Sequence, residues 1–147
     1  MKLALVTPMT LELERPDNEN KIASLDDSAY EPSLGVLTLT SVLRQTGISP
    51  QVIDLNGIIR NEYLDPNRQN EINVLEAASS AIAALDADIF GFGTICSSYP
   101  STIRLAEKIK HLRPGAKIIL GGPHAGFFAC KGSLTRLIPG RMIGVTR

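Results

Sequence analysis

The sequence predicts an open parallel α/β sheet of the Rossmann-like or flavodoxin-like class, with helices on both faces. Short apolar runs at residues 2–6, 51–55, 88–93 and 116–120 alternate with segments of helical periodicity. Each run is almost uniformly apolar, which is typical of strands covered on both faces. We expect about five strands in the order 2-1-3-4-5, with residues 141–145 forming the fifth strand.

Three segments between these strands have helical periodicity. The first spans residues 33–45, with Ser33 as the expected N-cap and Gly47 as the expected stop, and its apolar face is defined by residues 34, 37, 42 and 43. The other two repeat apolar residues every three or four positions: Ile72, Leu75, Ala78, Ile82 and Leu85, then Ile103, Ala106, Ile109 and Leu112. Residues 9–32 and 56–69 are polar and are expected to be loops, and residues 133–137 could form a last short helix.

Composition narrows the function classes. The 15 basic and 15 acidic side chains cancel, so no positive field attracts nucleic acid or an anionic membrane. Cys96 and Cys130 stand far apart without a Cys/His cluster, so we expect neither a zinc site nor an iron–sulfur site. No apolar stretch approaches the roughly 20 residues of a membrane helix. We expect a cytoplasmic protein with reduced thiols.

In such a sheet, ligands bind at the carboxyl ends of the strands near the switch in strand order. Here that edge is formed by the loops after the first, third and fourth strands. Residues 94–98 are rich in hydroxyl groups and precede a helix, so they could bind a polar ligand or simply cap that helix through Ser98 or Ser101. The run Gly121-Gly122-Pro123-His124 could allow close approach of a ligand, or it could be a tight turn.

Two other functions compete at the same edge. Cys96 could act as a nucleophile if His124 served as its base. A signalling receiver of this topology needs an acidic pocket, but Thr7 and Gly93 occupy the nearest positions and no lysine follows the fourth strand until Lys131. A protein that keeps the fold without any ligand is a further alternative.

The order and spacing of several short motifs resemble the N-terminal cobalamin-binding domain of the B12-dependent radical S-adenosylmethionine enzymes. The resemblance covers roughly residues 2–126, and the matching segments are residues 2–8, 31–37, 43–47, 52–56, 88–93, 99–100 and 114–124. It implies a corrin lying over the carboxyl ends of the strands, with the nucleotide tail of cobalamin entering the edge of the sheet. The residues that would border the cofactor are Thr7, Pro8, Leu34, Gly35, Thr94, Cys96, Ser97, Ser98, Tyr99, Gly121, Gly122, Pro123 and His124.

The sequence also departs from that family. The loop after the first strand contains no histidine, so the resemblance implies base-off cobalamin without a protein ligand from this loop. The Cys-x-x-x-Cys-x-x-Cys motif is absent, so the iron–sulfur cluster and S-adenosylmethionine would belong to a missing domain in a longer or separate chain. Residues 127–147 form an atypical tail, which indicates a fragment, a broken reading frame or a single-domain protein. We assign no catalytic or metal-binding residue and expect no catalysis by this chain alone.

Overall fold

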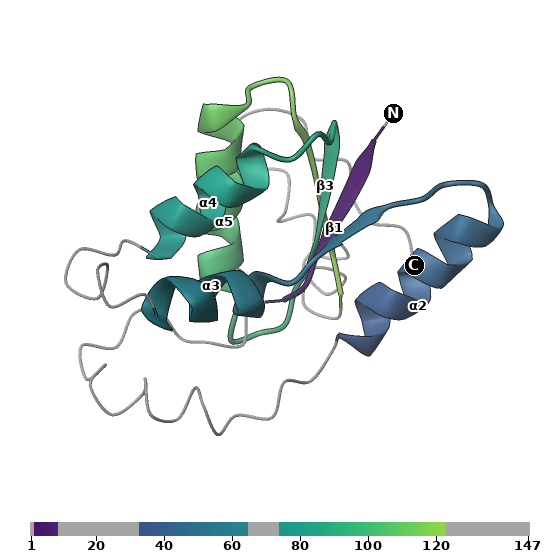
Figure 1. Ribbon diagram of the computed structural model, residues 1–147, viewed down its shortest axis with the longest axis horizontal. Helices are drawn as coiled ribbons and strands as arrows, with labels where there is room; N and C mark the ends of the chain where they lie inside the picture. Colours follow the sequence, from purple (N-terminus) through teal and green to yellow (C-terminus); the bar gives the residue numbers. More distant parts are fainter. Residues whose placement is uncertain (1, 9–32, 65–73, 123–147) are drawn as a thin grey trace.

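The structure is a computed structural model that describes residues 2–8, 33–64 and 74–122. These residues form a parallel sheet with helices on both faces (Figure 1). The elements in chain order are β1 (Leu3–Val6), α2 (Leu34–Gln45), β2 (Gln51–Ile53), α3 (Leu55–Leu64), α4 (Val74–Ala83), β3 (Ile89–Gly93), α5 (Tyr99–Leu112) and β4 (Lys117–Gly121). No helix among the described residues has both the length and the apolar character needed to cross a membrane.

The four strands are all parallel and lie in the order β2-β1-β3-β4. Val6 is in register with both Ile53 and Phe92, and Phe92 is in register with Leu120. The predicted fold class is confirmed, and the described strands follow the first four places of the predicted order. The fifth strand predicted at 141–145 and the helix predicted at 133–137 lie outside the described residues.

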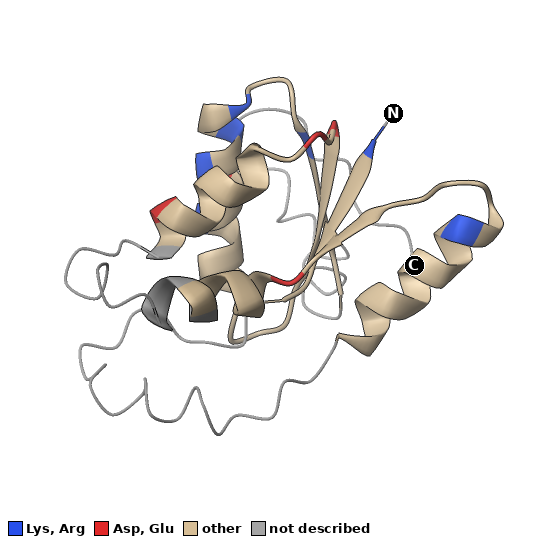
Figure 2. Cartoon of the chain, viewed as in Figure 1, with Lys and Arg blue, Asp and Glu red and all other residues tan. Residues whose placement is uncertain are grey.

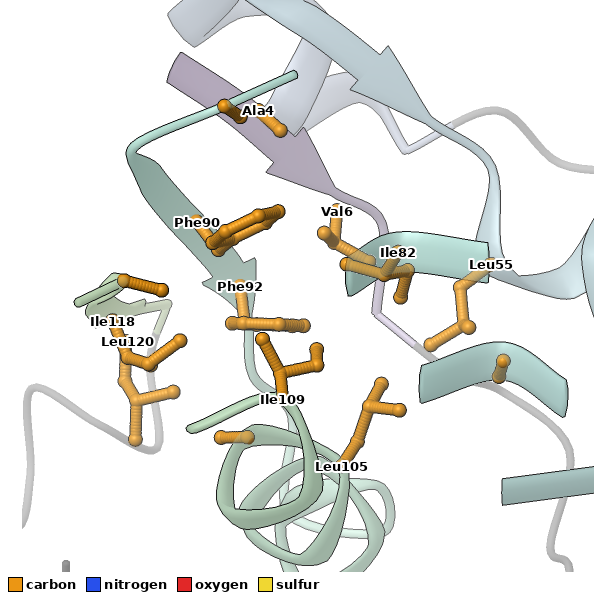
Figure 3. Close-up of a cluster of buried hydrophobic side chains, with 14 of the residues drawn as sticks. Ala4, Val6, Leu55, Ile82, Phe90, Phe92, Leu105, Ile109, Ile118 and Leu120 are labelled. Carbon is orange, nitrogen blue, oxygen red and sulfur yellow. The ribbon is translucent and has the colours of Figure 1, made fainter. Parts of the chain in front are cut away.

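The core lies between the sheet and the helices α3, α4 and α5, which cover the same face (Figure 1). Alternation along β3 points Phe90 and Phe92 into this core and leaves Gly91 on the opposite face. Figure 3 shows these rings beside Val6 and Ile109. A fully buried side chain of this size stabilises the fold by roughly 1.5–3 kcal/mol, so this layer fixes β3 in the middle of the sheet.

Helix α3 corrects the prediction of a loop for residues 56–64, and Leu55, expected in the second strand, opens this helix; residues 65–69 of the predicted loop lie outside the described residues. Leu55 and Ile59 are 2% and 0% exposed, and Ile58 packs against the same core. Their spacing of three and four residues is a helical face. The polar residues that suggested a loop include the exposed Asn61, so they reflect the solvent side of an amphipathic helix.

Helix α2 has the predicted extent but not the predicted buried face. Leu34, Leu37 and Val42 are 74%, 43% and 51% exposed, whereas Val36 and Thr40 are buried. Burial of Thr40 is tolerated because its hydroxyl donates a 2.8 Å hydrogen bond to the Val36 carbonyl. The buried face of α2 is therefore narrow and includes a threonine, so the spacing of apolar residues alone does not identify it.

The predictions for the two ends of α2 and for the following strand, β2, are confirmed only in part. Ser33 occupies the N-cap position but its side chain makes no capping hydrogen bond. Gly47 ends the helix as predicted, with φ at 81°. Strand β2 was expected to be covered on both faces, yet Gln51 and Val52 are exposed because β2 is the edge strand in the described sheet.

Candidate functional site

The carboxyl ends of the four strands lie at one edge of the sheet because the strands are parallel. The next described helix after β1 is α2, which lies on one face of the sheet, and the helix after β3 is α5, which lies on the other (Figure 1). The connections therefore diverge between β1 and β3. This is the switch point at which open α/β sheets bind ligands.

At the end of β1, Thr7 is joined to the start of α3. Its backbone N–H donates to the Ile53 carbonyl at 2.9 Å, and its hydroxyl oxygen accepts a 3.0 Å hydrogen bond from the Leu55 N–H. Asn56 extends this link, because its Nδ2 donates to the Pro8 carbonyl at 3.3 Å. Thr7 is only 8% exposed, so its side chain serves the junction of β1, β2 and α3.

Pro8 and Gly93 bring the ends of β1 and β3 close together. A Cβ atom added at Gly93 would lie 3.1 Å from Pro8 Cδ, which is tighter than an ordinary van der Waals contact. Glycine at position 93 therefore lets the proline ring approach the backbone of β3 directly. This contact lies at the switch point itself.

Thr94 and the two glycines after β4 form a second close contact. The Thr94 N–H and hydroxyl both donate 2.7 Å hydrogen bonds to the Gly121 carbonyl, and Thr94 is 1% exposed. Gly122 has φ at 101°, and a Cβ atom there would lie 2.4 Å from the Thr94 carbonyl oxygen. Conformation and space both require glycine at position 122, which leaves bare backbone at the end of β4.

The loop after β3 has a buried side and an exposed side. Ser98 is 4% exposed, and its hydroxyl both donates to the Ile95 carbonyl and accepts from the Ile95 N–H at 3.4 Å. Tyr99 is partly buried, and burial raises the pKa of its phenol. Cys96 and Ser97 are exposed, so they are the predicted loop residues that can meet a ligand from solvent.

The remaining predicted site residues are Leu34, Gly35, Pro123 and His124. Leu34 and Gly35 lie exposed at the start of α2, and a Cβ atom on Gly35 would have no neighbour within 4 Å. Pro123 and His124 lie outside the described residues.

Two residues at this edge were missed by the sequence reasoning. Leu55 and Asn56 join the end of β1 through their hydrogen bonds to Thr7 and Pro8. Asp54 directly precedes α3, and aspartate is a preferred N-cap residue. Asp54 followed by apolar residues at 55, 58 and 59 was therefore the available signal for this helix start.

The segments that directly follow three of the strands, residues 7–8, 94–98 and 121–122, carry no charged side chain. Asp54 is the charged residue that follows β2. Figure 2 shows the other charged residues of the described chain at the amino ends of the strands and on the helices. In the described part of the chain, the ends of β1, β3 and β4 therefore offer hydroxyl and backbone groups rather than charges.

Comparison with known proteins identifies the family. A family model described as B12 binding domain matches residues 27–131, which is most of the chain. No solved structure matches the chain.

Among curated proteins, the mitochondrial glycine dehydrogenases (decarboxylating) of Gallus gallus and Homo sapiens are each 60% identical over 35 residues. Those residues are 24% of this chain and 4% and 3% of the two enzymes. The probable glycine dehydrogenase (decarboxylating) subunit 1 of Protochlamydia amoebophila is 32% identical over 76 residues, 51% of this chain and 17% of that protein. The chain thus spans a small part of these relatives. The match that extends over most of the chain is to the B12 binding domain, and the chain belongs to that family.

Proposed function

We propose that this domain binds cobalamin with the corrin lying across the carboxyl ends of β1, β3 and β4. The observation that carries the proposal is the bare backbone at Gly121 and Gly122. Gly122 is held in a conformation that favours glycine, against the buried and doubly hydrogen-bonded Thr94. A broad, rigid ligand can approach such a strand end without meeting a side chain.

The chemistry of this edge fits the periphery of the cofactor. Cobalamin presents neutral amide side chains around the corrin, which both donate and accept hydrogen bonds. Cys96 and Ser97 are exposed beside the switch point, and the described residues that directly follow β1, β3 and β4 (7–8, 94–98 and 121–122) carry no charged side chain. The predicted contacts of Pro8, Ser97, Gly121 and Gly122 are retained in this proposal. Thr7, Thr94 and Ser98 support the site from buried positions.

We also propose that the cofactor binds base-off, without a histidine ligand from the loop after β1. Residues 7–32 contain no histidine, and His111 lies exposed near the end of α5, by the amino ends of the strands. His124 follows β4 and not β1. This feature distinguishes the domain from cobalamin domains that carry an Asp-x-His-x-x-Gly motif after their first strand.

The resemblance of residues 2–126 supports a role beside a radical S-adenosylmethionine domain in a longer or separate chain. Bound methylcobalamin supplies a methyl group in such systems, and this chain's own part is to hold the corrin and leave its upper face open. Tagged protein recovered from its source organism should carry with it a polypeptide identified as having the Cys-x-x-x-Cys-x-x-Cys motif. Recovery of the tagged protein without such a polypeptide, under conditions that preserve iron–sulfur proteins, would argue against this partner.

The test of binding is a titration of the purified protein with methylcobalamin and hydroxocobalamin, followed by visible absorbance and calorimetry. We expect saturable heat, and an absorbance change that reports release of the benzimidazole from cobalt. A folded protein that shows neither signal would refute cobalamin binding. Saturable binding with the base-on spectrum retained would refute only the base-off mode.

A further inference from the structure

We infer that Asn56 and Thr7 are positioning residues for cobalamin, and that they act by holding the Pro8 end of β1 against Gly93. This inference rests on the proposed function, because it assumes that the corrin lies over this edge. It assigns a role to the start of α3, a segment from which the resemblance implied no residue bordering the cofactor. It also gives Thr7 a supporting role in place of the direct contact predicted from the sequence.

Pro8 lies two residues after β1 and is the last described residue of this segment, and three hydrogen bonds fix the end of β1 on the side of β2. The Thr7 N–H donates to Ile53, the Thr7 hydroxyl accepts from Leu55, and Asn56 Nδ2 donates to the Pro8 carbonyl. The first bond continues the pairing of β1 with β2, but the other two use side chains and the start of α3. The end of β1 is therefore attached to α3 as well as to the sheet.

On the side of β3, the same end packs against bare backbone. Pro8 Cδ lies 3.1 Å from the position that a Gly93 Cβ would take. Proline has no N–H, so Pro8 cannot donate a backbone hydrogen bond to β3 that would hold this contact. The bond from Asn56 to the Pro8 carbonyl supplies a restraint on the opposite side of the proline.

Helix α3 is a rigid base for this restraint. Leu55 and Ile59 are buried in the core, so the start of the helix cannot shift without disturbing that packing. Asn56 lies between the buried Leu55 and Gly57 and is itself only partly exposed. The core therefore sets the position of Pro8 through α3. The contact of Pro8 with Gly93 at the switch point, over which the corrin is proposed to lie, is set in the same way.

The decisive variant is Asn56→Ala, and α3 provides its matched control in Asn61→Ala. Both substitutions replace asparagine by alanine in the same helix, so their effects on helix propensity are similar, but Asn61 is exposed. We expect Asn56→Ala to weaken methylcobalamin binding about five-fold, the usual net effect of one neutral hydrogen bond, and Asn61→Ala to leave it unchanged. Asn56→Gln, which keeps the amide on a longer side chain, should recover part of the loss.

A second readout on the same samples is the ¹H–¹⁵N resonance of Gly93 in the absence of cofactor. If Asn56 positions Pro8, the Gly93 resonance shifts in Asn56→Ala and stays in place in Asn61→Ala. Equal cobalamin affinities for the two variants would overturn the inference even if the wild-type protein binds well.

If the wild-type protein does not bind cobalamin, the proposed function fails, and the assignment of cofactor positioning fails with it. The Gly93 resonance then still decides whether the link from Asn56 to β3 exists. An unchanged resonance in Asn56→Ala would overturn the structural link as well, so the two failures are distinguishable.

Discussion

The amino and carboxyl ends of the same four strands are held in different ways. At the amino ends, charged side chains make the stabilising contacts. The Lys2 side chain pairs with Asp86, and the Lys2 backbone N–H donates to Asp88 Oδ2 at 2.8 Å. Arg113 donates to the carbonyls of Ala83 and Leu85 and lies over the Phe90 ring at 5.6 Å from its centroid. At the carboxyl ends, the described contacts of Thr7, Pro8, Thr94 and the glycines involve neutral groups.

This difference separates a structural edge from a binding edge. Long charged side chains cover the ends of strands and satisfy carbonyl groups, but they also occupy the space above them. Short hydroxyl side chains also form hydrogen bonds with backbone groups, and glycines have no side chain, so both leave the backbone accessible. Substitutions at the amino edge should therefore change stability alone, whereas substitutions at the carboxyl edge should also change cofactor binding.

The largest effect is expected from Arg113→Ala. The substitution removes hydrogen bonds from a charged group to two carbonyls and its stacking on Phe90, and should lower the free energy of unfolding by about 3 kcal/mol. Arg44→Ala is the control, because Arg44 is exposed in the last turn of α2 and should contribute only about 0.3 kcal/mol. Denaturant unfolding measures both losses, and cobalamin titration should find unchanged affinity. Weaker cobalamin binding by folded Arg113→Ala protein would contradict the separation of the edges.

Gly122→Ala should come next and should affect both properties. The new Cβ would clash with the Thr94 carbonyl oxygen, and alanine is strained at this φ, so we expect a loss of about 2 kcal/mol in stability. Cobalamin binding should weaken as well, because the end of β4 moves. Gly115→Ala is the matched control, since Gly115 lies at the amino edge with nothing within 4 Å of a Cβ. Equal binding and equal stability of the two variants would contradict a role for Gly122 at the binding edge.

Thr7→Val is expected to lower stability by about 1.5 kcal/mol. Valine has nearly the same shape but cannot accept the hydrogen bond from the Leu55 N–H, which stays buried without that acceptor. The control is Thr40→Val on α2, where the lost hydroxyl is a donor to a carbonyl of its own helix. Chemical denaturation should show a clearly larger loss for position 7. Comparable losses at both positions would mean that the junction of β1 with α3 contributes no special stability.

The smallest effect concerns Tyr99 and appears only at high pH. Burial raises the pKa of the folded-state phenol above its ordinary value of 10.0, so below pH 10 the phenol is neutral in both states and costs nothing. As the pH rises above 10, the unfolded chain releases this proton first, and stability falls. Thermal unfolding over a pH series should therefore show a smaller alkaline loss for Tyr99→Phe than for the wild-type protein. Parallel curves would refute a raised pKa for Tyr99.

The fold could be predicted from the sequence where a residue pattern is compatible with one kind of structure only. The uniform strands at 88–93 and 116–120 had to be buried, and their spacing from the intervening helical segment left few parallel topologies. The double glycine at the end of the fourth predicted strand permits the positive φ found at Gly122, but it left a tight turn and the close approach of a ligand as alternatives. Helix α3 was missed because its sequence is rich in polar residues.

The candidate site could be predicted in place but not in detail. Parallel topology fixes which loops share an edge, and at this edge Thr94 is hydrogen-bonded to Gly121 while Pro8 lies against Gly93. The hydrogen bonds from Leu55 and Asn56 to the end of β1 depend on three-dimensional pairing across about fifty residues, which no local motif encodes. For the same reason, the buried role of the Thr7 hydroxyl could not be distinguished from a ligand contact.

The most direct test of the binding edge is a pair of variants, Ser97→Trp and Ser80→Trp, titrated with methylcobalamin beside the wild-type protein. Both serines are exposed, but Ser97 follows β3 at the carboxyl edge whereas Ser80 lies on α4. We predict that Ser97→Trp weakens binding by about ten-fold or more, a change of about 1.4 kcal/mol, at unchanged stability, while Ser80→Trp binds like the wild type. Equal binding by the two variants would show that cobalamin does not lie over the carboxyl ends of these strands.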